Sequence, residues 1–369
     1  MTPSPDAHLY CRPTGFIDAP FGFDGQFARL AGGMQFFSMW EIIAVENGKR
    51  IGSALVPVDQ VDGYLGGCTT AQSECAALAM KRATSPRAAL QLGERTVRLD
   101  QPQVMAILNM TPDSFSGGSD LISNPTEAAA LAVGMASAGA AIIDIGGEST
   151  RPGAPTVWEE DEKARVIPLI QQLAPSGTAI SIDTRKAAVM EAALGAGAHM
   201  VNDVSALLFD DRALSIVATS NCPVVLMHYP GKPSDPHGND SYGDPLIDIY
   251  DWLDDRIEAV VAAGIARDRI IVDPGIGFGK ASVAHNLQIL NGLALLHGLG
   301  CPILLGASRK RLIGALSNEA PPSERLGGSV ALAMKGAEQG AQIIRVHDVP
   351  ETVQALRVWR GLRDAALSG

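Results

Sequence analysis

Residues 179–203 read AISIDTRKAAVMEAALGAGAHMVND and contain one complete strand–helix–strand repeat. The repeat begins with a short apolar run, Ala179–Ile182, and ends with a second run, Met200–Val201. The segment between them is rich in alanine and leucine, and its apolar residues have helical spacing. Short apolar strands joined by helices are typical of parallel sheets, whose two faces are both covered. The stretch therefore predicts an α/β fold with a parallel sheet.

Comparable apolar runs recur beyond residue 100, each followed by a longer segment of helical period. There are eight: Val104–Leu108, Ile142–Ile145, Ala179–Ile182, Met200–Val201, Val224–Met227, Ile270–Val272, Ile303–Leu305 and Ile343–Val346. Eight such units close naturally into a (β/α)8 TIM barrel of about 250 residues. We therefore expect a barrel over residues 99–369 and an N-terminal extension of unknown fold over residues 1–98. An open, doubly wound sheet is the alternative.

Nearly every run ends in polar residues or glycines. They are Asn109, Asp144, Asp183, Asn202–Asp203, His228, Asp273, Gly306 and Arg345–His347. In a barrel the carboxyl ends of all strands share one face, so these residues would converge on one site. In an open sheet, only those near the point where strand order reverses could meet one ligand.

The first 98 residues lack this repeat. Within them, Met39–Val45 favours β-structure and Ala71–Met80 favours a helix. A strand-like run, Thr96–Leu99, directly precedes the barrel and is placed to cap its bottom. No residue of the extension suggests chemistry.

The chain is acidic, with 29 Lys and Arg against 40 Asp and Glu and a net charge of −11. Broad nucleic-acid binding needs a basic surface, so no nucleic-acid partner is expected. An anionic substrate would need a local cationic pocket. The barrel mouth offers one in Arg151, Lys280, Arg309, Lys310 and Arg345.

The cysteines indicate a reducing compartment. The five of them are scattered and include no CxxC pair, which predicts neither a disulfide framework nor a zinc site. The N-terminus has no basic region followed by an apolar run, as a secretory signal would. The most apolar stretch, residues 128–145, is interrupted by glycines and predicts a helix running into a strand. We expect a cytoplasmic protein with no membrane partner.

Several strand-end residues are suited to ligand binding. Asn109 offers an amide oxygen of the kind Mg²⁺ accepts beside water and substrate phosphates, although a capped βα loop is the alternative. Arg151 lies in a glycine-flanked loop and can bind an anion through two hydrogen bonds, or it is a surface residue in a turn. Asp183 and Asn202, taken singly, also fit helix caps.

Two segments near the C-terminus suggest anion binding. GASRK, residues 306–310, predicts a helix that begins near Ser308, where free backbone N–H groups would bind a carboxylate. Arg345 and His347 alternate along a strand, so both side chains point to one side and can act on one ligand.

The segment DPGIGFGK, residues 273–280, superficially resembles a phosphate loop. A Walker A motif ending at Gly279-Lys280 needs glycine at position 274 and Ser or Thr at 281, where Pro and Ala stand. The GxGxxG spacing fails as well. What remains is an aspartate at a strand end, Phe278 on a tight loop, and a lysine.

Taken in order, these motifs resemble the series found in dihydropteroate synthases. They are NMTPDSFS, DIGGESTRPG, SIDTRK, NDVSAL, VDPGIGFGK, GASRK, ERLGGSV and RVHD, within residues 104–348. The resemblance implies a (β/α)8 transferase of folate biosynthesis, in which 4-aminobenzoate displaces diphosphate from (7,8-dihydropterin-6-yl)methyl diphosphate to give 7,8-dihydropteroate. It also implies Mg²⁺ as cofactor, a homodimer, and sulfonamides as competitors of 4-aminobenzoate.

The resemblance implies a role for individual residues. The pterin-binding positions are Asp183, Asn202, Asp273 and Lys310. Arg345 would stack on the pterin and, with His347 and Asn109, hold the diphosphate and its Mg²⁺. The aminobenzoate site would be shaped by Thr150, Arg151, Pro152, Phe278 and Ser308. Asp183, Asp273, Lys310 and Arg345 would carry the catalysis.

Two other functions remain as alternatives. A pterin-binding methyltransferase barrel shares the Asp and Asn pterin readers, but it has no diphosphate to bind and no need of Arg151, Ser308 or His347. A non-catalytic binding protein would be favoured if Asn109, Arg151 or Lys310 were missing, and all are present.

Overall fold

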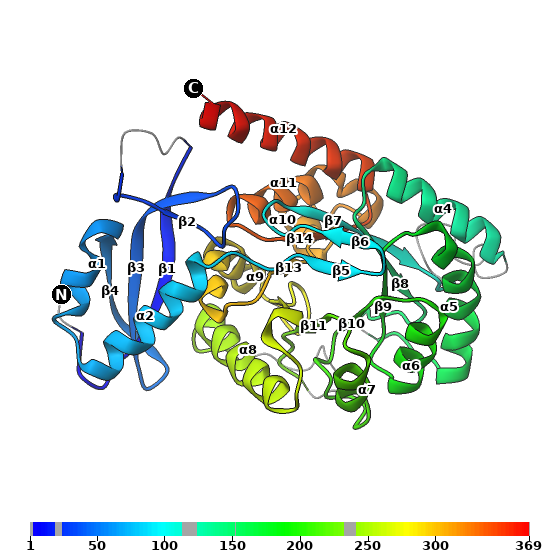
Figure 1. Ribbon diagram of the computed structural model, residues 1–369, viewed down its shortest axis with the longest axis horizontal. Coiled ribbons are helices and arrows are strands. Elements are labelled where there is room, and N and C mark those ends of the chain that lie inside the picture. Colours follow the sequence, from blue (N-terminus) through cyan, green and yellow to red (C-terminus); the bar gives the residue numbers. More distant parts are fainter. Residues whose placement is uncertain (1–2, 19–23, 113–123, 152, 232–240, 369) are drawn as a thin grey trace.

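Eight parallel strands form the centre of the molecule (Figure 1). The computed structural model describes residues 3–18, 24–112, 124–151, 153–231 and 241–368 of the 369. The strands are β7 (Gln103–Asn109), β8 (Ile142–Gly146), β9 (Ile180–Asp183), β10 (Met200–Asp203), β11 (Val224–Met227), β12 (Ile270–Asp273), β13 (Leu304–Leu305) and β14 (Ile343–Val346). Their order is β12-β11-β10-β9-β8-β7-β14-β13, and a bridge between Val272 and Ile303 joins the two ends. The predicted barrel is confirmed.

All eight predicted runs overlap a barrel strand. The strand predicted at Met200–Val201 continues to Asp203. The run Ile303–Leu305 gives a regular strand of only two residues, Leu304–Leu305. The Ile303 N–H donates to the side-chain oxygen of Gln342 at 2.8 Å, so it is not used in a regular backbone ladder. The barrel is therefore least regular where β12 meets β13.

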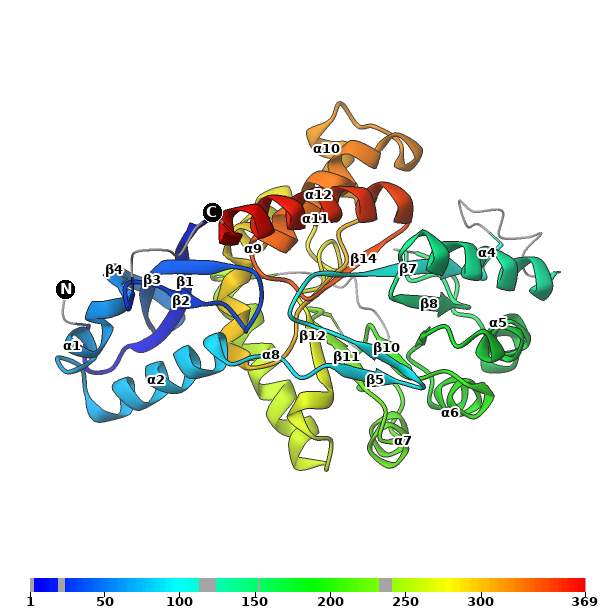
Figure 2. The same ribbon diagram turned by 45° about the horizontal axis from the view of Figure 1, so that its top comes forward.

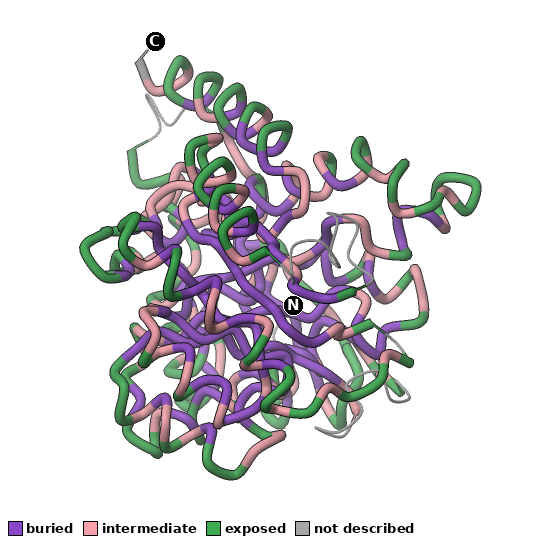
Figure 3. Tube along the Cα trace, turned by 90° about the vertical axis from the view of Figure 1, so that its right-hand side faces the viewer, coloured by how far each residue is buried: buried purple, intermediate pink, exposed green. Residues whose placement is uncertain are grey.

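Helices form the outer layer around the barrel (Figure 2). They are α4 (Pro125–Ala138), α5 (Glu159–Leu173), α6 (Ala187–Ala196), α7 (Ala213–Ser220), α8 (Pro245–Ala262), α9 (Val283–Gly292), α10 (Arg311–Leu316), α11 (Leu326–Glu338) and α12 (Val349–Ser368). Gly139 and Gly197 end α4 and α6 at φ of 117° and 114°, values that suit glycine. The strands inside this layer are buried on both faces (Figure 3), which explains their continuous apolar sequences.

The parallel register brings the strand ends to one level. Asn109 pairs with Gly146, Gly146 with Asp183, and Asp183 with Asn202. Asn109, Asp183 and Asn202 therefore lie together at the carboxyl end of the barrel as predicted, whereas the His228 ring packs against Trp252 and His228 does not line the cavity.

A hairpin closes the opposite end of the barrel. Strands β5 (Leu90–Leu92) and β6 (Arg95–Val97) are antiparallel, and their apolar side chains share one buried cluster with Leu99 and the first residues of the barrel strands. The predicted cap at Thr96–Leu99 is confirmed, although it is one half of a hairpin rather than a single strand.

The rest of the extension is a small antiparallel sheet backed by helices. Its elements are β1 (His8–Ile17), β2 (Ala28–Arg29), β3 (Phe36–Glu46), β4 (Lys49–Pro57), α1 (Val61–Leu65) and α2 (Thr70–Thr84). Strand β3 is central, with β1 on one side and β2 and β4 on the other. The predicted β-structure at Met39–Val45 and helix at Ala71–Met80 lie within β3 and α2.

The sheet packs against the side of the barrel, beside α8 and the 3-10 segment Leu293–Leu299 (Figures 1 and 2). Tyr10 donates a hydrogen bond to Asp251 of α8 at 2.7 Å, and Arg363 of α12 donates to Asp18 at 2.7 Å. The division into an extension over residues 1–98 and a barrel domain over residues 99–369 stays a prediction. Among the described residues, no helix has both the length and the apolarity to cross a membrane.

Candidate active site

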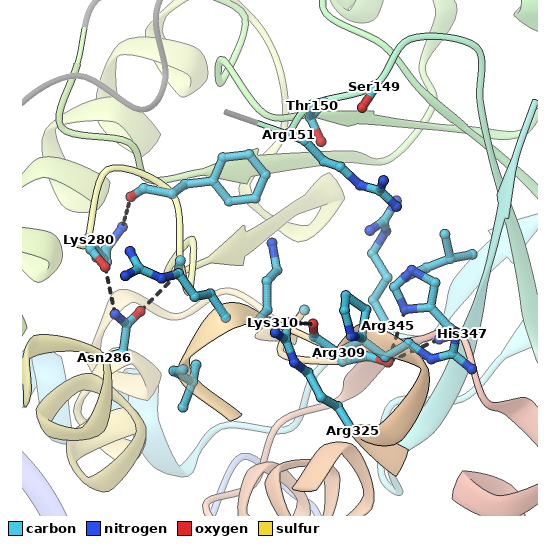
Figure 4. Close-up of a pocket in the computed structure, with 18 of the residues that line it drawn as sticks. Ser149, Thr150, Arg151, Lys280, Asn286, Arg309, Lys310, Arg325, Arg345 and His347 are labelled. Carbon is cyan, nitrogen blue, oxygen red and sulfur yellow. Dashed lines mark hydrogen bonds between the residues drawn. The ribbon is translucent and has the colours of Figure 1, made fainter. Parts of the chain in front are cut away.

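A cavity of about 780 Å³ opens at the carboxyl end of the barrel (Figure 4). This volume suits a small-molecule site. The predicted site residues that line it are Asn109, Thr150, Arg151, Asp183, Phe278, Ser308, Lys310, Arg345 and His347. Asn202 and Asp273 lie beneath them at the ends of β10 and β12. Pro152 lies outside the described residues.

The floor of the cavity is a chain of charged and polar side chains from four strands. Arg345 donates from Nε to Asp144 Oδ2 and from a terminal nitrogen to Asp183 Oδ2, both at 2.6 Å. Asn202 donates to the same oxygen of Asp144 at 2.9 Å. One guanidinium thus holds two carboxylates that point into the barrel.

Burial shifts the proton affinities of this floor. It raises the pKa of Asp183 to about 7, and the neighbouring Asp144 carboxylate adds to the rise while Arg345 opposes it. Burial by itself would lower the pKa of Arg345, but Asp144 and Asp183 together raise it above its ordinary value. Arg345 is therefore a permanent cation between two closely spaced acids.

The two carboxylates retain unused acceptors. In the described part of the chain, Asp144 Oδ1 and Asp183 Oδ1 are buried without a hydrogen-bond partner. A buried acceptor without a donor is costly, and Asp183 lines the cavity, so its unused oxygen points to a ligand that supplies an N–H group. The floor fits the polar edge of a heterocycle.

One wall combines an acid, a cation and an aromatic ring. Asp273 Oδ1 accepts from the Gly275 N–H at 2.7 Å, and burial raises its pKa. Lys310 Nζ lies 4.1 Å from the centre of the Phe278 ring, a cation–π contact. Burial, with Arg345 nearby, lowers the pKa of Lys310 to about 8.

The loop that carries Phe278 is held from below. Asn286 of α9 accepts from the Gly277 N–H and donates to the Lys280 carbonyl, both at 2.8 Å. Lys280 Nζ donates to the carbonyls of Gly275 at 2.8 Å and Phe278 at 3.0 Å. Lys280, expected in the cationic pocket, therefore uses its ammonium group to fix the loop.

The turn after β13 differs from expectation. Helix α10 begins at Arg311, so the prediction of a helix starting near Ser308 is wrong. Arg309 has a left-handed backbone at φ 55° and pairs with Asp348. Ser308 Oγ accepts from the His347 backbone N–H at 3.2 Å and lies 3.1 Å from His347 Nδ1. Ser308 thus orients His347 instead of opening a helix.

Thr150 and Arg151 stand on a loop that is fixed at its start. Glu148 accepts from the Val157 N–H at 3.0 Å and forms ion pairs with Arg185 and Lys186, both at 3.1 Å. Burial would raise the Glu148 pKa, but these hydrogen bonds and cations together lower it.

Four residues of the site received no role from the sequence: Asp144, Glu148, Asn286 and Arg325, although Asp144 was among the strand-end residues expected to converge. Asp144 carried a signal, because it is a charged residue inside the apolar run Ile142–Ile145. Arg325 lines the cavity and donates to the carbonyls of Arg309 at 3.0 Å and Ala320 at 2.7 Å, a role without a local sequence signal.

Protein side chains alone do not form a metal centre within the described ranges, where no group of three or more His, Cys, Asp or Glu side chains is arranged to hold an ion. Asn109 lies on the cavity wall at the end of β7, beside Gly146 and Asp183. This single oxygen donor fits Mg²⁺ that keeps its waters and is shared with substrate phosphates.

Fold and site define a (β/α)8 barrel with a charged cavity of small-molecule size at the carboxyl ends of its strands. The family model described as "Pterin binding enzyme" matches residues 105–347. Dihydropteroate synthase of Escherichia coli is 45% identical over 261 residues, which cover 70% of this chain and 91% of that protein. The chain belongs to the dihydropteroate synthase family of transferases.

Two solved structures agree with this assignment. Dihydropteroate synthase of Xanthomonas albilineans with 4-aminobenzoic acid is 45% identical, with a TM-score of 0.70, and the match covers 75% of this chain and 98% of that one. The Burkholderia cenocepacia enzyme complexed with 7,8-dihydropteroate is 44% identical, with a TM-score of 0.70 and coverage of 76% and 98%. The match therefore includes almost all of both relatives and about three quarters of this chain.

Proposed function

We propose that this chain condenses 4-aminobenzoate with (7,8-dihydropterin-6-yl)methyl diphosphate to give 7,8-dihydropteroate and diphosphate. The observation that carries the proposal is the cavity floor, where Arg345 bridges Asp144 and Asp183, and where Asp183, which lines the cavity, keeps an unused acceptor. The alternative of a methyltransferase is less well supported, because such an enzyme binds no diphosphate and would not need the anion-binding groups around this floor.

The floor is proposed as the pterin subsite. The heterocycle carries N–H groups along one edge, which would meet the oxygens of Asp183 and Asp273 and the amide of Asn202. Lys310 would donate to a ring acceptor from the side of Phe278. Arg345 would lie against the ring. Because two carboxylates already fix its side chain, little side-chain entropy would be lost when substrate binds.

The aminobenzoate subsite is proposed above it, between Phe278 and the loop that carries Thr150, Arg151 and Pro152. Phe278 would contact the aromatic ring, and Arg151 is suited to the carboxylate. The Ser308 hydroxyl and nearby backbone would complete the subsite. Sulfonamides, which resemble 4-aminobenzoate, should compete for it.

The reaction would break the bond between the exocyclic methylene carbon and the diphosphate oxygen. The electron-rich pterin supports positive charge on the methylene, and Asp183 and Asp273 would stabilise it. The amine nitrogen then bonds to this carbon and loses a proton. Asp183, Asp273, Lys310 and Arg345 would therefore be the catalytic residues, and no covalent enzyme intermediate is required.

The leaving diphosphate would be held by Arg345, His347 and Asn109. Burial and the adjacent Arg345 lower the pKa of His347 to about 3, so the ring is neutral near pH 7. Because Ser308 lies beside Nδ1, the other ring nitrogen would donate to the phosphate. Mg²⁺, when bound at Asn109, would neutralise negative charge on the leaving group.

The setting of the enzyme is also proposed. All five cysteines are free, which supports a cytoplasmic location. We expect a homodimer, small-molecule substrates, and neither a nucleic-acid nor a membrane partner.

The test is a diphosphate-release assay on the purified chain. Release should require 4-aminobenzoate, the pterin diphosphate and Mg²⁺ together, and should be inhibited by sulfonamides in competition with 4-aminobenzoate. Lys310→Ala should abolish pterin binding without unfolding the barrel. A folded protein that releases no diphosphate with all three components present would refute the proposal.

A further inference from the structure

The extension meets the barrel at the start of α8, which is also part of the support of the pocket. Arg50, on the hairpin between β3 and β4, pairs with Asp244, and the second contact of this pair measures 3.2 Å. Asp244 is the N-cap of α8, because its side chain accepts from the Leu246 N–H at 3.1 Å. The turn of the hairpin packs here too, since a Cβ on Gly243 would stand 3.5 Å from the Gly48 carbonyl.

A second contact lies further along the same helix. The Tyr10 hydroxyl donates to both oxygens of Asp251, at 2.7 and 2.8 Å, and the Tyr10 ring meets Tyr250 edge-on at 5.4 Å. The sheet therefore holds α8 at its N-cap and two turns later. Figures 1 and 2 both place the N-terminal sheet beside this helix.

From α8, aromatic contacts lead to Phe278. Trp252 follows Asp251 directly, and its ring lies 5.0 Å from His228 and 5.5 Å from Tyr229. Tyr229 shares a buried cluster with Phe278, and Trp252 packs against that cluster. The side of Phe278 away from the cavity thus rests on residues that α8 positions.

A parallel route leads to the loop at residues 275–280. Tyr242, next to the hairpin contact, meets His285 edge-on at 5.6 Å in the first turn of α9. The next residue, Asn286, holds the loop through Gly277 and Lys280. His228 also touches the loop, because a Cβ on Gly275 would stand 2.1 Å from its carbonyl oxygen.

We propose that the β3–β4 hairpin positions the aminobenzoate wall of the pocket, and that Arg50 is the positioning residue, acting through Asp244 and α8 on Phe278. The inference rests on the proposed function, because it names the subsite that the extension controls. The Asp144–Asp183–Arg345 floor lies on β8, β9 and β14 and touches none of the contacts described, whereas Asp273 accepts from Gly275 of the loop and Lys310 contacts Phe278. The extension should therefore affect 4-aminobenzoate more strongly than the pterin diphosphate.

The experiment compares Arg50→Ala with the wild-type full-length chain, varying each substrate in turn. Arg50→Ala should raise the KM for 4-aminobenzoate by about two- to fivefold, the range expected for a half-exposed ion pair. The KM for the pterin diphosphate should rise less than the KM for 4-aminobenzoate. Arg50→Lys should restore most of the affinity, and Tyr10→Phe should act in the same direction as Arg50→Ala.

Lys49→Ala is the matched control, since it removes the neighbouring charge from the same hairpin without touching Asp244. Its kinetics should equal those of the wild type. Salt is a second control: at about 1 M the ion pair is screened, so the difference between wild type and Arg50→Ala should shrink. An unchanged KM for 4-aminobenzoate in Arg50→Ala, or a parallel rise in both KM values, would overturn the proposal.

Amide hydrogen exchange gives a readout that does not depend on turnover. Peptides covering residues 241–252 and 275–286 should exchange faster in Arg50→Ala than in Lys49→Ala, while β8 and β9 stay protected. Equal exchange in both variants would contradict the inference. If the wild-type chain released no diphosphate, the proposed function would fail, and the exchange comparison would still decide the role of the hairpin.

Discussion

Replacing Arg345 by glutamine should make the stability of the barrel strongly dependent on pH. In the wild type, the guanidinium contacts Asp144 and Asp183 at 2.6 Å each, and the Asp144 side chain is fully buried. Glutamine keeps a hydrogen-bonding side chain of moderate length but removes the charge. Two neighbouring carboxylates would then share the interior of the barrel without a cation.

The size of the effect follows from burial. Removing one partner of a buried ion pair typically costs about 3–5 kcal/mol of stability, because the charge left behind has lost its compensation. Proton uptake by a carboxylate relieves part of this cost. Burial already raises the Asp183 pKa to about 7 while Arg345 opposes the rise, so loss of Arg345 should raise it further.

The sign is set by linkage. The folded-state pKa of Asp183 lies above the value of about 3.9 for an unfolded aspartate, so folding takes up a proton. Its contribution to stability is present at low pH and is lost as pH rises through the folded pKa. In Arg345→Gln this loss should continue to higher pH. The difference in the free energy of unfolding between wild type and variant should be small near pH 5 and should widen above pH 7.

Urea denaturation of both proteins across this pH range measures the gap. The double variant Arg345→Gln/Asp183→Asn should recover part of the lost stability, since one uncompensated charge is gone. Arg345→Lys, which keeps the charge but cannot bridge both carboxylates, should be intermediate. A gap that does not vary with pH, or a double variant no more stable than Arg345→Gln, would refute the reasoning.

Three other predictions concern the pocket. Affinity for the pterin diphosphate should fall as pH rises through about 8, because the Lys310 ammonium group loses its charge there. Lys310→Arg should move this fall to higher pH. An identical pH profile for the variant would contradict the prediction. Glu148→Gln should lower the free energy of unfolding by about 1–3 kcal/mol, as expected when a buried charged hydrogen bond is weakened, whereas Glu160→Gln on the exposed surface should not. Chelation of Mg²⁺ should stop diphosphate release reversibly. Asn109→Ala should raise the Mg²⁺ concentration needed for half-maximal rate. If variant and wild type need the same Mg²⁺ concentration, Asn109 is not part of the metal site.

The barrel was predictable because its signals are local. Runs such as Val224–Met227 are apolar throughout, as strands buried on both faces must be, and a polar residue follows where this run ends. The extension was harder to predict. Strand β1 contains Pro13 and Gly15, which weaken a strand signal, and only its pairing with β3 makes it regular.

The site was predictable in its members but not in its connections. Arg345 and Asp144 are 201 residues apart, and no local pattern pairs them. At Ser308 the local signal misled: serine is a favoured N-cap, but its hydroxyl is taken by His347 and the chain passes through a left-handed residue before α10 begins. Lys280 was expected to contribute charge to the cationic pocket, and only the fold shows that its ammonium group donates to backbone carbonyls.

The place of β14 in the barrel affects how the chain folds while it is being synthesised on the ribosome. Four residue pairs join this last strand to β7, the first, and β14 also holds β13 in the sheet. Chains are made from the N-terminus, so the ring cannot close until residues 343–346 have left the ribosome. The same strand brings Arg345, so the two acids on β8 and β9 stay without their cation until then. A nascent chain stalled earlier should be an open sheet with uncompensated charge at its centre, the form most in need of a chaperone.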